Sequence, residues 1–178
     1  MLGLYQPQAG TILIDGIDTR QHAPVALRQA IGHVPQEFEL FFGTVEQNLR
    51  LSMPTARPGD IAAAIDQAGI GRLIDQLPGG LGHRVGDGRH RHVPAGLVGG
   101  LGLASAYLRQ PRLLLLDEVI DNLDPDLTAA FHRHLDRCRG RVTVVMVTHR
   151  PATMRRADRV LVLNGGSIVR NGSPAELM

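Results

Sequence analysis

Two adjacent carboxylates, Asp117 and Glu118, directly follow an apolar run at residues 113–116. A run that is apolar on both sides predicts a strand buried between two layers of helices. The carboxyl end of such a strand is the edge of an open α/β sheet at which ligands bind. An acid at that edge can hold Mg²⁺, and its neighbour can orient or deprotonate a water molecule. The structural alternative is that both acids only cap the turn that follows the strand.

Other strands are expected on both sides of this run. Residues 10–20 alternate apolar and polar side chains around a turn at Asp15-Gly16, which predicts an antiparallel hairpin. Residues 30–36 form a short apolar strand that ends at Pro35, and residues 142–149 are predicted to be a second fully buried strand. Residues 158–172 predict a strand, a turn and a hairpin partner.

The helices are expected between these strands. A helical period begins near residue 59, with Asp60 as its cap, and a second short helix runs to Pro78-Gly79-Gly80. Asp124 followed by Pro125 predicts the start of a third helix, which Gly140 closes. Residues 81–96 form a polar loop rich in glycine. Strands that alternate with helices predict an α/β fold with a mainly parallel core sheet.

Composition narrows the class of protein. The length of 178 residues suits one domain, and the apolar fraction of 43% argues against disorder. A formal net charge of +2 and an aromatic content of 3% argue against a nucleic-acid-binding surface. The single cysteine, Cys138, excludes an internal disulfide and suggests a reducing compartment. No apolar run is long enough for a membrane span.

With these motifs in place, the chain resembles the nucleotide-binding domain of ABC transporters, from about residue 2 to its end. "LLLLDE" (113–118) stands where that family has its Walker B motif. The resemblance implies that Asp117 is the carboxylate on the Mg²⁺ side and that Glu118 is the base that orients the attacking water. It implies that Gln36, in "VPQ", touches the metal and relays the nucleotide state. Asp124 ends the D-loop "DNLD", and His149 in "VMVTHR" is similar to the switch histidine that faces the γ-phosphate.

Two further segments are similar to the exporter branch of this family, "LFFGTVEQN" (40–48) and "VGDG" (85–88). The resemblance implies a P-loop NTPase-like ABC ATPase fold with a mainly parallel core sheet, an antiparallel β subdomain and a helical subdomain. The helical subdomain is expected at about residues 44–108, inserted in the α/β core of a partial domain spanning 1–178. The implied cofactors are ATP and Mg²⁺. The implied partners are the membrane-spanning domain of an exporter and a second nucleotide-binding domain in a head-to-tail dimer, at the cytoplasmic face of the membrane.

One family element has no counterpart in these residues. The phosphate loop G-x-x-x-x-G-K-[ST] does not occur, and all 19 basic residues are arginine. We therefore expect the chain to begin inside the domain, beyond the phosphate loop and without the strand that leads into it. By the resemblance, that strand would lie between residues 142–148 and 159–163. Its absence is expected to expose two apolar strand edges and to lower solubility.

A second departure concerns the signature motif, L-S-G-G-Q in the family. Here the aligned positions include Pro94, Ala95 and Gly96, flanked by Val93 and Leu97. Pro94 offers neither a hydroxyl nor an N–H group, and Ala95 adds a methyl group where backbone approaches phosphate. Glycines at 99, 100 and 102 are each expected to cost the following helix about 1 kcal/mol. We expect this degenerate half-site to be disabled.

Two functional classes remain open at this stage. In the first, the chain is the ATPase half of an exporter, with Glu118 and His149 as catalytic residues and Gln36 and Asp117 at the metal. In the second, it is a non-catalytic remnant or partner module that docks a membrane domain through Gln36 and residues 38–48. Histidines in "RHRH" (89–92) are better explained as a solvated basic loop than as a metal site, and Cys138 as a passive thiol.

Overall fold

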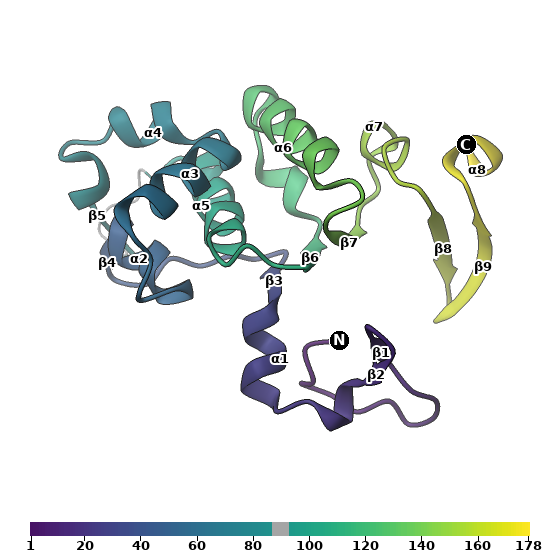
Figure 1. Cartoon of the computed structure of the whole chain (residues 1–178). Helices are drawn as coiled ribbons and strands as arrows, with labels where there is room; N and C mark the ends of the chain where they lie inside the picture. Colours follow the sequence, from purple (N-terminus) through teal and green to yellow (C-terminus); the bar gives the residue numbers. More distant parts are fainter. Residues whose placement is uncertain (87–92) are drawn as a thin grey trace. The chain divides into compact units, whose positions relative to one another are not determined.

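A computed structural model describes residues 1–86 and 93–178, so the predicted loop "RHRH" and part of "VGDG" lie outside the described residues. The chain divides into two units, Met1–Met146 and Val147–Met178 (Figure 1). Among the residues described, none of the helices combines the length and the apolar character that crossing a bilayer requires.

The first unit carries most of the elements. Its strands are β1 (Leu13–Ile14), β2 (Ile17–Asp18), β3 (Ile31–Val34), β4 (Gly43–Thr44), β5 (Arg84–Val85), β6 (Leu113–Asp117) and β7 (Thr143–Val147), the last of which ends at the boundary between the units. Its α-helices are α1 (Pro24–Ala30), α2 (Val45–Ser52), α3 (Pro58–Ala68), α4 (Gly71–Asp75), α5 (Ala95–Leu108) and α6 (Pro125–Cys138). Short 3-10 turns lie at η1 (Thr19–Gln21), η2 (Gly80–Gly82) and η3 (Val119–Asn122).

The central sheet has the order β3-β6-β7, with β6 in the middle. β3 and β6 are parallel, and their register pairs Ile31 with Leu113 and Val34 with Leu116. Leu114 and Leu116 are buried, as the run of leucines predicts. The expected α/β architecture with a parallel core sheet is confirmed.

The expectation for residues 142–149 was only partly right. They do form a strand, β7, but it is not fully buried, because its side chains alternate between exposed and half-buried. Val144 and Met146 pack on the core, whereas Val145 and Val147 are exposed. β7 ends the sheet, so among the described strands it pairs only with β6. This alternation of exposed and half-buried side chains is that of a strand with only one covered face.

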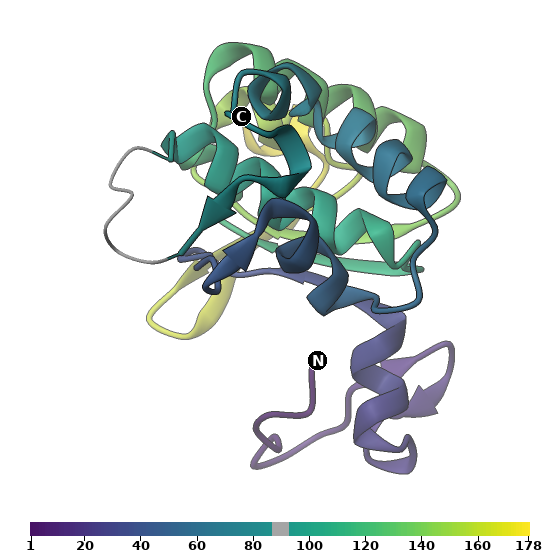
Figure 2. The ribbon, with the colours of Figure 1, turned by 90° about the vertical axis from the view of Figure 1, so that its left-hand side faces the viewer.

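Helices α5 and α6 lie on one side of this sheet, with α2 and α3 packed against them, and α1 with the β1–β2 hairpin lies on the other side (Figures 1 and 2). The hairpin turns at Asp15 and Gly16 as predicted, and both have positive φ. α1 contributes Leu27 to a small cluster with Ile31 and Leu113. This cluster is separate from the main core under the helices.

The start of α3 differs from the prediction. Asp60 is not the N-cap; Arg57 occupies that position, and Pro58 is the first helical residue. Asp60 still satisfies the helix end, because its carboxylate accepts the backbone N–H of Arg57 at 3.0 Å. The buried face of α3 carries Ile61 and Ala64 as the helical period predicts.

Helix α5 is apolar all round and is correspondingly buried from Gly100 to Leu108. Its glycines are sites of close packing, and the expectation that they only weaken the helix was incomplete. A Cβ on Gly100 would lie 2.2 Å from Ile70 Cγ2, and one on Gly102 would lie 3.0 Å from Phe38 Cγ. Because Gly100 and Gly102 have no side chain, Ile70 and Phe38 can pack closely against α5. This packing offsets the low helix propensity of the two glycines.

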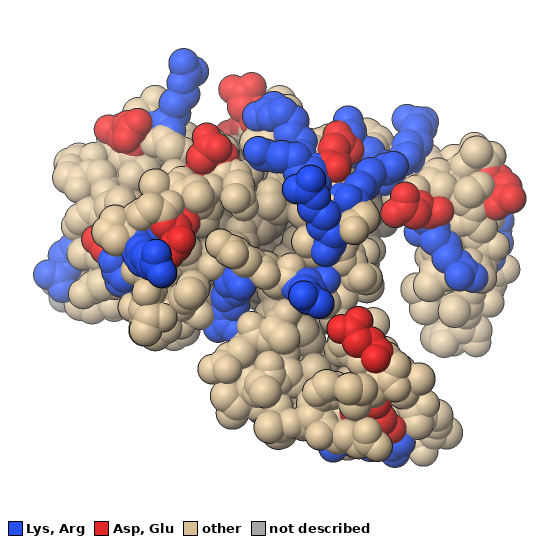
Figure 3. All heavy atoms as spheres, viewed as in Figure 1, with Lys and Arg blue, Asp and Glu red and all other residues tan. Residues whose placement is uncertain are grey.

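Helix α6 begins as predicted, with Asp124 as N-cap and Pro125 as the first residue. Its side chain Phe131 is fully buried in the core. On the surface, arginine side chains gather over α6 and the turn after it (Figure 3). Arginines near a helix C-terminus interact favourably with its dipole. The last turn also buries Cys138, and this burial raises the pKa of its thiol, as fits a passive role.

The second unit contains α7 (Pro151–Met154), the antiparallel strands β8 (Val160–Asn164) and β9 (Ser167–Gly172), and α8 (Pro174–Leu177). The hairpin agrees with the predicted one at residues 158–172. Three of its large apolar side chains, Leu161, Leu163 and Ile168, are about half exposed or more. A lone two-stranded hairpin is marginal in water, so this unit needs further apolar contacts for independent stability.

The close approach at Gly100 gives a stability prediction. Gly100→Ala should lower the free energy of unfolding by about 1–2 kcal/mol, because the steric cost of overpacking exceeds the gain in helix propensity. Urea denaturation of the full chain measures this. Gly59→Ala is the matched control, since a Cβ at Gly59 in α3 meets nothing within 4 Å. A more stable Gly100→Ala variant would show that Ile70 moves aside at little cost.

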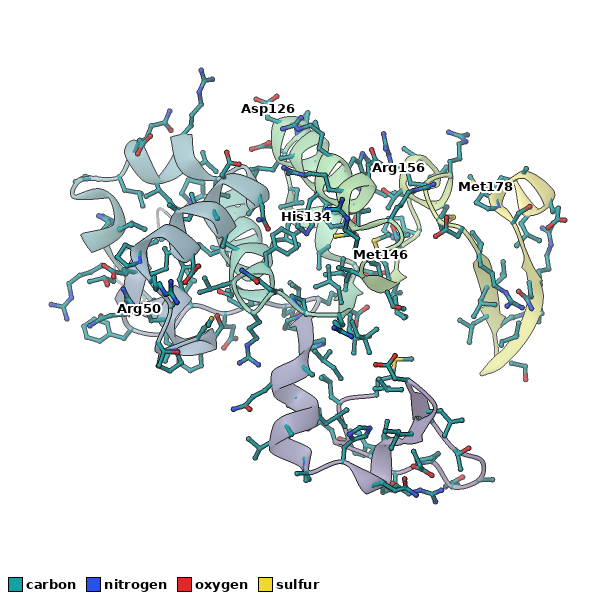
Figure 4. The ribbon with its side chains drawn as sticks, viewed as in Figure 1. Arg50, Asp126, His134, Met146, Arg156 and Met178 are labelled. Atoms are coloured by element: carbon teal, nitrogen blue, oxygen red, sulfur yellow. The ribbon has the colours of Figure 1, made fainter. Side chains whose placement is uncertain are left out.

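A second prediction concerns a stacked pair between α5 and α6. The ring centroids of Tyr107 and His134 lie 3.7 Å apart, and the Tyr107 hydroxyl and His134 Nδ1 are buried without hydrogen-bond partners. His134 is labelled on α6 in Figure 4. Burial, and secondarily the charge of Arg137, lower the pKa of His134 from 6.5 to about 4. The unfolded chain therefore binds more protons between these two values, so stability is lost as pH falls through this window.

Denaturant midpoints measured from pH 7 to pH 4 test this expectation. His134→Phe keeps a stacked ring but removes the titrating group, so its midpoint should fall less with pH than that of the parent chain. His33 also has a pKa lowered by burial, and it contributes equally to both proteins. Identical pH profiles for the two proteins would exclude His134 as a source of the acid sensitivity.

Candidate functional site

The candidate site is centred on the carboxyl end of β6. Leu114 and Leu116 anchor the strand in the core, and Asp117 and Glu118 emerge from it at the sheet edge. Glu118 adopts a left-handed conformation, with φ 46° and ψ 27°, and the turn η3 begins at the next residue. A non-glycine residue in this region carries strain of about 1–2 kcal/mol. Strained backbone conformations cluster at active sites and ligand-binding sites, so the conformation of Glu118 indicates a functional position.

Gln36 meets Glu118 at this edge. Its Nε2 donates a hydrogen bond of 2.7 Å to Glu118 Oε2, across 82 residues of sequence. The register explains the contact: Val34 pairs with Leu116, so Gln36 and Glu118 each stand two residues beyond a matched pair. Because β3 and β6 are parallel, their carboxyl ends deliver both side chains to one place.

The residues near this edge offer oxygen ligands for a magnesium ion. Mg²⁺ prefers carboxylate and carbonyl oxygens, and Asp117 supplies a carboxylate here. Gln36 uses its Nε2 group on Glu118, so its Oε1 remains as an acceptor. The donor set fits the metal. The chemistry for nucleotide phosphates is less complete, because the 178 residues contain neither lysine nor the phosphate-loop motif.

Asp117 also acts on the neighbouring strand. His33, on β3, has a pKa that burial lowers, while the charge of Asp117 opposes this shift. The pairing of His33 with Leu115 places it close to this carboxylate. The edge therefore contains an acid whose field reaches the adjacent strand.

A hollow of about 410 Å³ lies beside Gln36. Its lining joins the segment after β3 to the start of α5 and consists of Gln36, Glu37, Phe38, Val93, Ala95, Val98 and Gly99. Two of the predicted site residues, Gln36 and Ala95, thus lie at one hollow although 59 positions separate them in the sequence. The wall is mainly apolar.

The residues aligned with the signature motif form the first turn of α5. Pro94 is its N-cap and makes no side-chain cap, and Ala95 and Gly96 begin the helix. Leu97 is fully buried in the main core. The apolar residue at position 97 therefore has a packing role, which the sequence comparison with the family motif did not show.

Asp124 has a different contact in the structure. Asp124 caps α6, where its Oδ1 accepts the backbone N–H of Leu127 at 2.8 Å, so its observed contact is structural. His149 belongs to the second unit, in the segment between β7 and α7. The described structure therefore brings Gln36, Asp117 and Glu118 to one sheet edge and Ala95 to the adjoining hollow.

The structure also shows a polar clamp that sequence reasoning missed. Asn48 is buried on α2; its Oδ1 accepts the Phe41 N–H at 2.8 Å, and its Nδ2 donates to the carbonyls of Phe41 and Thr44. Thr44 and Gln47 form a capping box at the start of α2. The capping box was detectable as T-x-x-Q, whereas no local pattern announces the contact of Asn48 with Phe41.

The chain is similar to known proteins over most of its length. The family model described as "ABC transporter" matches residues 1–121, and a model of an AAA domain matches residues 97–155. The chain is 37% identical, over 99% of its length, to the "Mycobactin import ATP-binding/permease protein IrtB" of Mycolicibacterium thermoresistibile, of which it covers 30%. It is 34% identical, over all of its length, to the "Fatty acid ABC transporter ATP-binding/permease protein" of Mycobacterium bovis, of which it covers 28%.

A solved structure gives the same result in three dimensions. The "Structure of a bacterial Atm1-family ABC exporter with ATP bound" matches 99% of this chain with a TM-score of 0.91 and 30% identity, and the match covers 31% of that chain. The chain thus spans less than a third of the length of these relatives. The matched family model extends over more than half of the chain and includes Gln36, Asp117 and Glu118. The chain belongs to the ABC transporter family and has the fold of an exporter-type nucleotide-binding domain.

Proposed function

We propose that this chain is the ATP-binding domain of an exporter-type ABC transporter, in which MgATP hydrolysis is coupled to transport across a membrane. The observation that carries the proposal is the hydrogen bond between Gln36 and Glu118 at the carboxyl end of β6. It joins two residues that the family resemblance assigns to the same reaction. The similarity to an exporter with ATP bound supports the same assignment.

In this proposal Glu118 is the catalytic base. Bound MgATP supplies a phosphoryl group that passes to water, and the task of the chain is to position that water and to offset charge. Glu118 accepts a proton from the water, and Gln36 fixes the orientation of its carboxylate through the observed contact. Asp117 and the Oε1 atom of Gln36 would hold Mg²⁺ when it binds. His149 would keep the role of switch histidine that the family resemblance gives it.

The partners follow from the same family. We propose that a membrane-spanning domain docks on residues 38–48 at the cytoplasmic face, and that a second nucleotide-binding domain pairs head to tail. The proposed helical subdomain, about residues 44–108, would comprise α2 through α5. It presents Pro94, Ala95 and Gly96 at the first turn of α5, where the family contacts the nucleotide of the opposite subunit. Asp124, as the end of the D-loop, lies at the start of α6.

We further propose that the 178-residue chain does not hydrolyse ATP alone. It contains no lysine and no phosphate loop, and Pro94 has no hydroxyl or N–H group to offer. The second candidate function, a non-catalytic docking module, is favoured by these substitutions. The two candidates differ in whether Glu118 ever acts on water.

A chimera distinguishes them. Residues 1–178 replace the aligned stretch of the Atm1-family exporter, which then supplies the membrane-spanning domain and the phosphate loop. We expect slow MgATP hydrolysis, and we expect Pro94→Ser with Ala95→Gly to raise it by about tenfold or more by restoring polar contacts. Adding Glu118→Gln should then abolish turnover while nucleotide remains bound. Phosphate release and retained radiolabelled ATP are the two measurements.

The control for the charge change is Asp66→Asn, which alters an exposed acid on α3, outside residues 38–48. It should leave hydrolysis unchanged. If the chimera that keeps Pro94 and Ala95 hydrolyses ATP as fast as the Atm1-family exporter itself, the signature segment is not disabled. Unchanged hydrolysis after Glu118→Gln would exclude Glu118 as the base. For the isolated chain, saturable micromolar MgATP binding would contradict the proposed inactivity.

A further inference from the structure

Two buried polar groups between α5 and α6 lack hydrogen-bond partners among the residues that the structure describes. They are the hydroxyl group of Tyr107, on α5, and the Nδ1 atom of His134, on α6. Tyr107 is only 4% exposed, and its ring stacks on the imidazole with 3.7 Å between the ring centroids. Because a buried polar group without a partner is costly, this pair indicates a site for a bound ligand.

Cys138 adds a sulfur atom to this pair. It lies four residues after His134 on α6, and side chains at positions i and i+4 of a helix are neighbours on one face. The thiol is buried, which suits a metal ligand as well as an unreactive side chain. Burial raises the pKa of the Tyr107 hydroxyl, and the charge that Cys138 would carry as a thiolate raises it further. An imidazole nitrogen, a sulfur and a phenol oxygen therefore lie near one another between the two helices.

The charges around these groups suit a metal ion of low charge. Burial, and secondarily the charge of Arg137, lower the pKa of His134 to about 4, so the imidazole is neutral at neutral pH, as a metal ligand must be. Burial raises the pKa of the Cys138 thiol, and the charge of Arg137 partly offsets this rise. The arginine thus favours the thiolate that binds metal, and it disfavours a second large positive charge beside it.

We propose that His134 and Cys138 bind a copper(I) ion, and that the Tyr107 hydroxyl donates a hydrogen bond to the Cys138 sulfur. This assignment gives a partner to both of the unpaired buried groups. Copper(I) replaces the thiol proton, which passes to solvent, so the step needs neither an oxidant nor a reductant. The site uses none of the residues at the carboxyl end of β6 and does not rest on the proposed function.

The choice of copper(I) follows from ligand number and charge. Thiolate sulfur favours copper(I) and zinc among the common metal ions. A structural zinc site takes four protein ligands, but among the described residues no third histidine, cysteine or acid forms a cluster with His134 and Cys138. One thiolate cancels the charge of copper(I), whereas Zn²⁺ would keep a net positive charge in a buried place beside Arg137, which is costly.

Copper(I) held by bicinchoninate is the probe, and it is offered to the full chain without oxygen and without nucleotide. The loss of colour of the copper–bicinchoninate complex measures transfer, and we expect about one copper ion per chain. Cys138→Ser should abolish this transfer. His134→Phe keeps a stacked ring and should weaken copper binding about a hundredfold, and Tyr107→Phe should weaken it about tenfold, as expected for the loss of a hydrogen bond to a ligand atom.

His132→Phe is the matched control, because His132 lies on α6 two residues before His134 and cannot share its face, so this variant should bind copper as the parent chain does. Thermal unfolding without copper shows whether each variant folds, and added copper should raise the midpoint of the parent chain but not that of Cys138→Ser. Absence of transfer to the folded parent chain would overturn the proposal. So would transfer that survives Cys138→Ser, or an affinity that His134→Phe leaves unchanged. Tighter binding of Zn²⁺ than of copper(I) would overturn the choice of a singly charged ion.

Discussion

Parallel pairing between β3 and β6 is the constraint on which the candidate site depends. The pairing of residues 31–34 with residues 113–116 sets which side chains reach the carboxyl edge together. A shift of one residue would break the pairing of Val34 with Leu116 and move Gln36 out of register with Glu118. Burial of Leu114 and Leu116 therefore fixes the site geometry as well as the fold. The strained backbone of Glu118 is held by the same anchoring, since its neighbours on β6 cannot relax without leaving the core.

The helical layer holds the segment after β3 in place by close packing. Phe38 lies against Gly102, and Ile70 lies against Gly100, so α5 is in direct contact with both the site segment and α3–α4. The residues aligned with the signature motif are the first turn of this same helix. Movement of the segment that carries Gln36 would therefore act on α5 through a rigid contact rather than a flexible loop. Phe41 and Phe42 belong to the same segment, so only a few residues separate the proposed docking residues 38–48 from the site.

Several features could be predicted from the sequence because local physical rules determine them. The buried strand before Asp117, the hairpin at Asp15 and Gly16, and the cap at Asp124 all follow from apolar period and turn chemistry. Predictions were wrong where burial depends on neighbours in space. Residues 142–149 are as apolar as a buried strand, but only one face of β7 is covered. The sequence correctly indicated that Gly100 and Gly102 have low helix propensity. It did not show that Ile70 and Phe38 pack so closely there that a Cβ would clash.

By itself the sequence determined the family motifs, the absence of lysine and of a phosphate loop among these residues, and the degenerate residues at 94–96. These are statements about residue types and spacing, which need no coordinates. Only the tertiary structure decided that Gln36 bonds to Glu118, that Ala95 shares a hollow with Gln36, and that Arg84 stacks on Phe42. Each of these contacts joins residues more than 40 positions apart, and their meeting depends on strand register and helix packing. No local pattern in the chain encodes those distances.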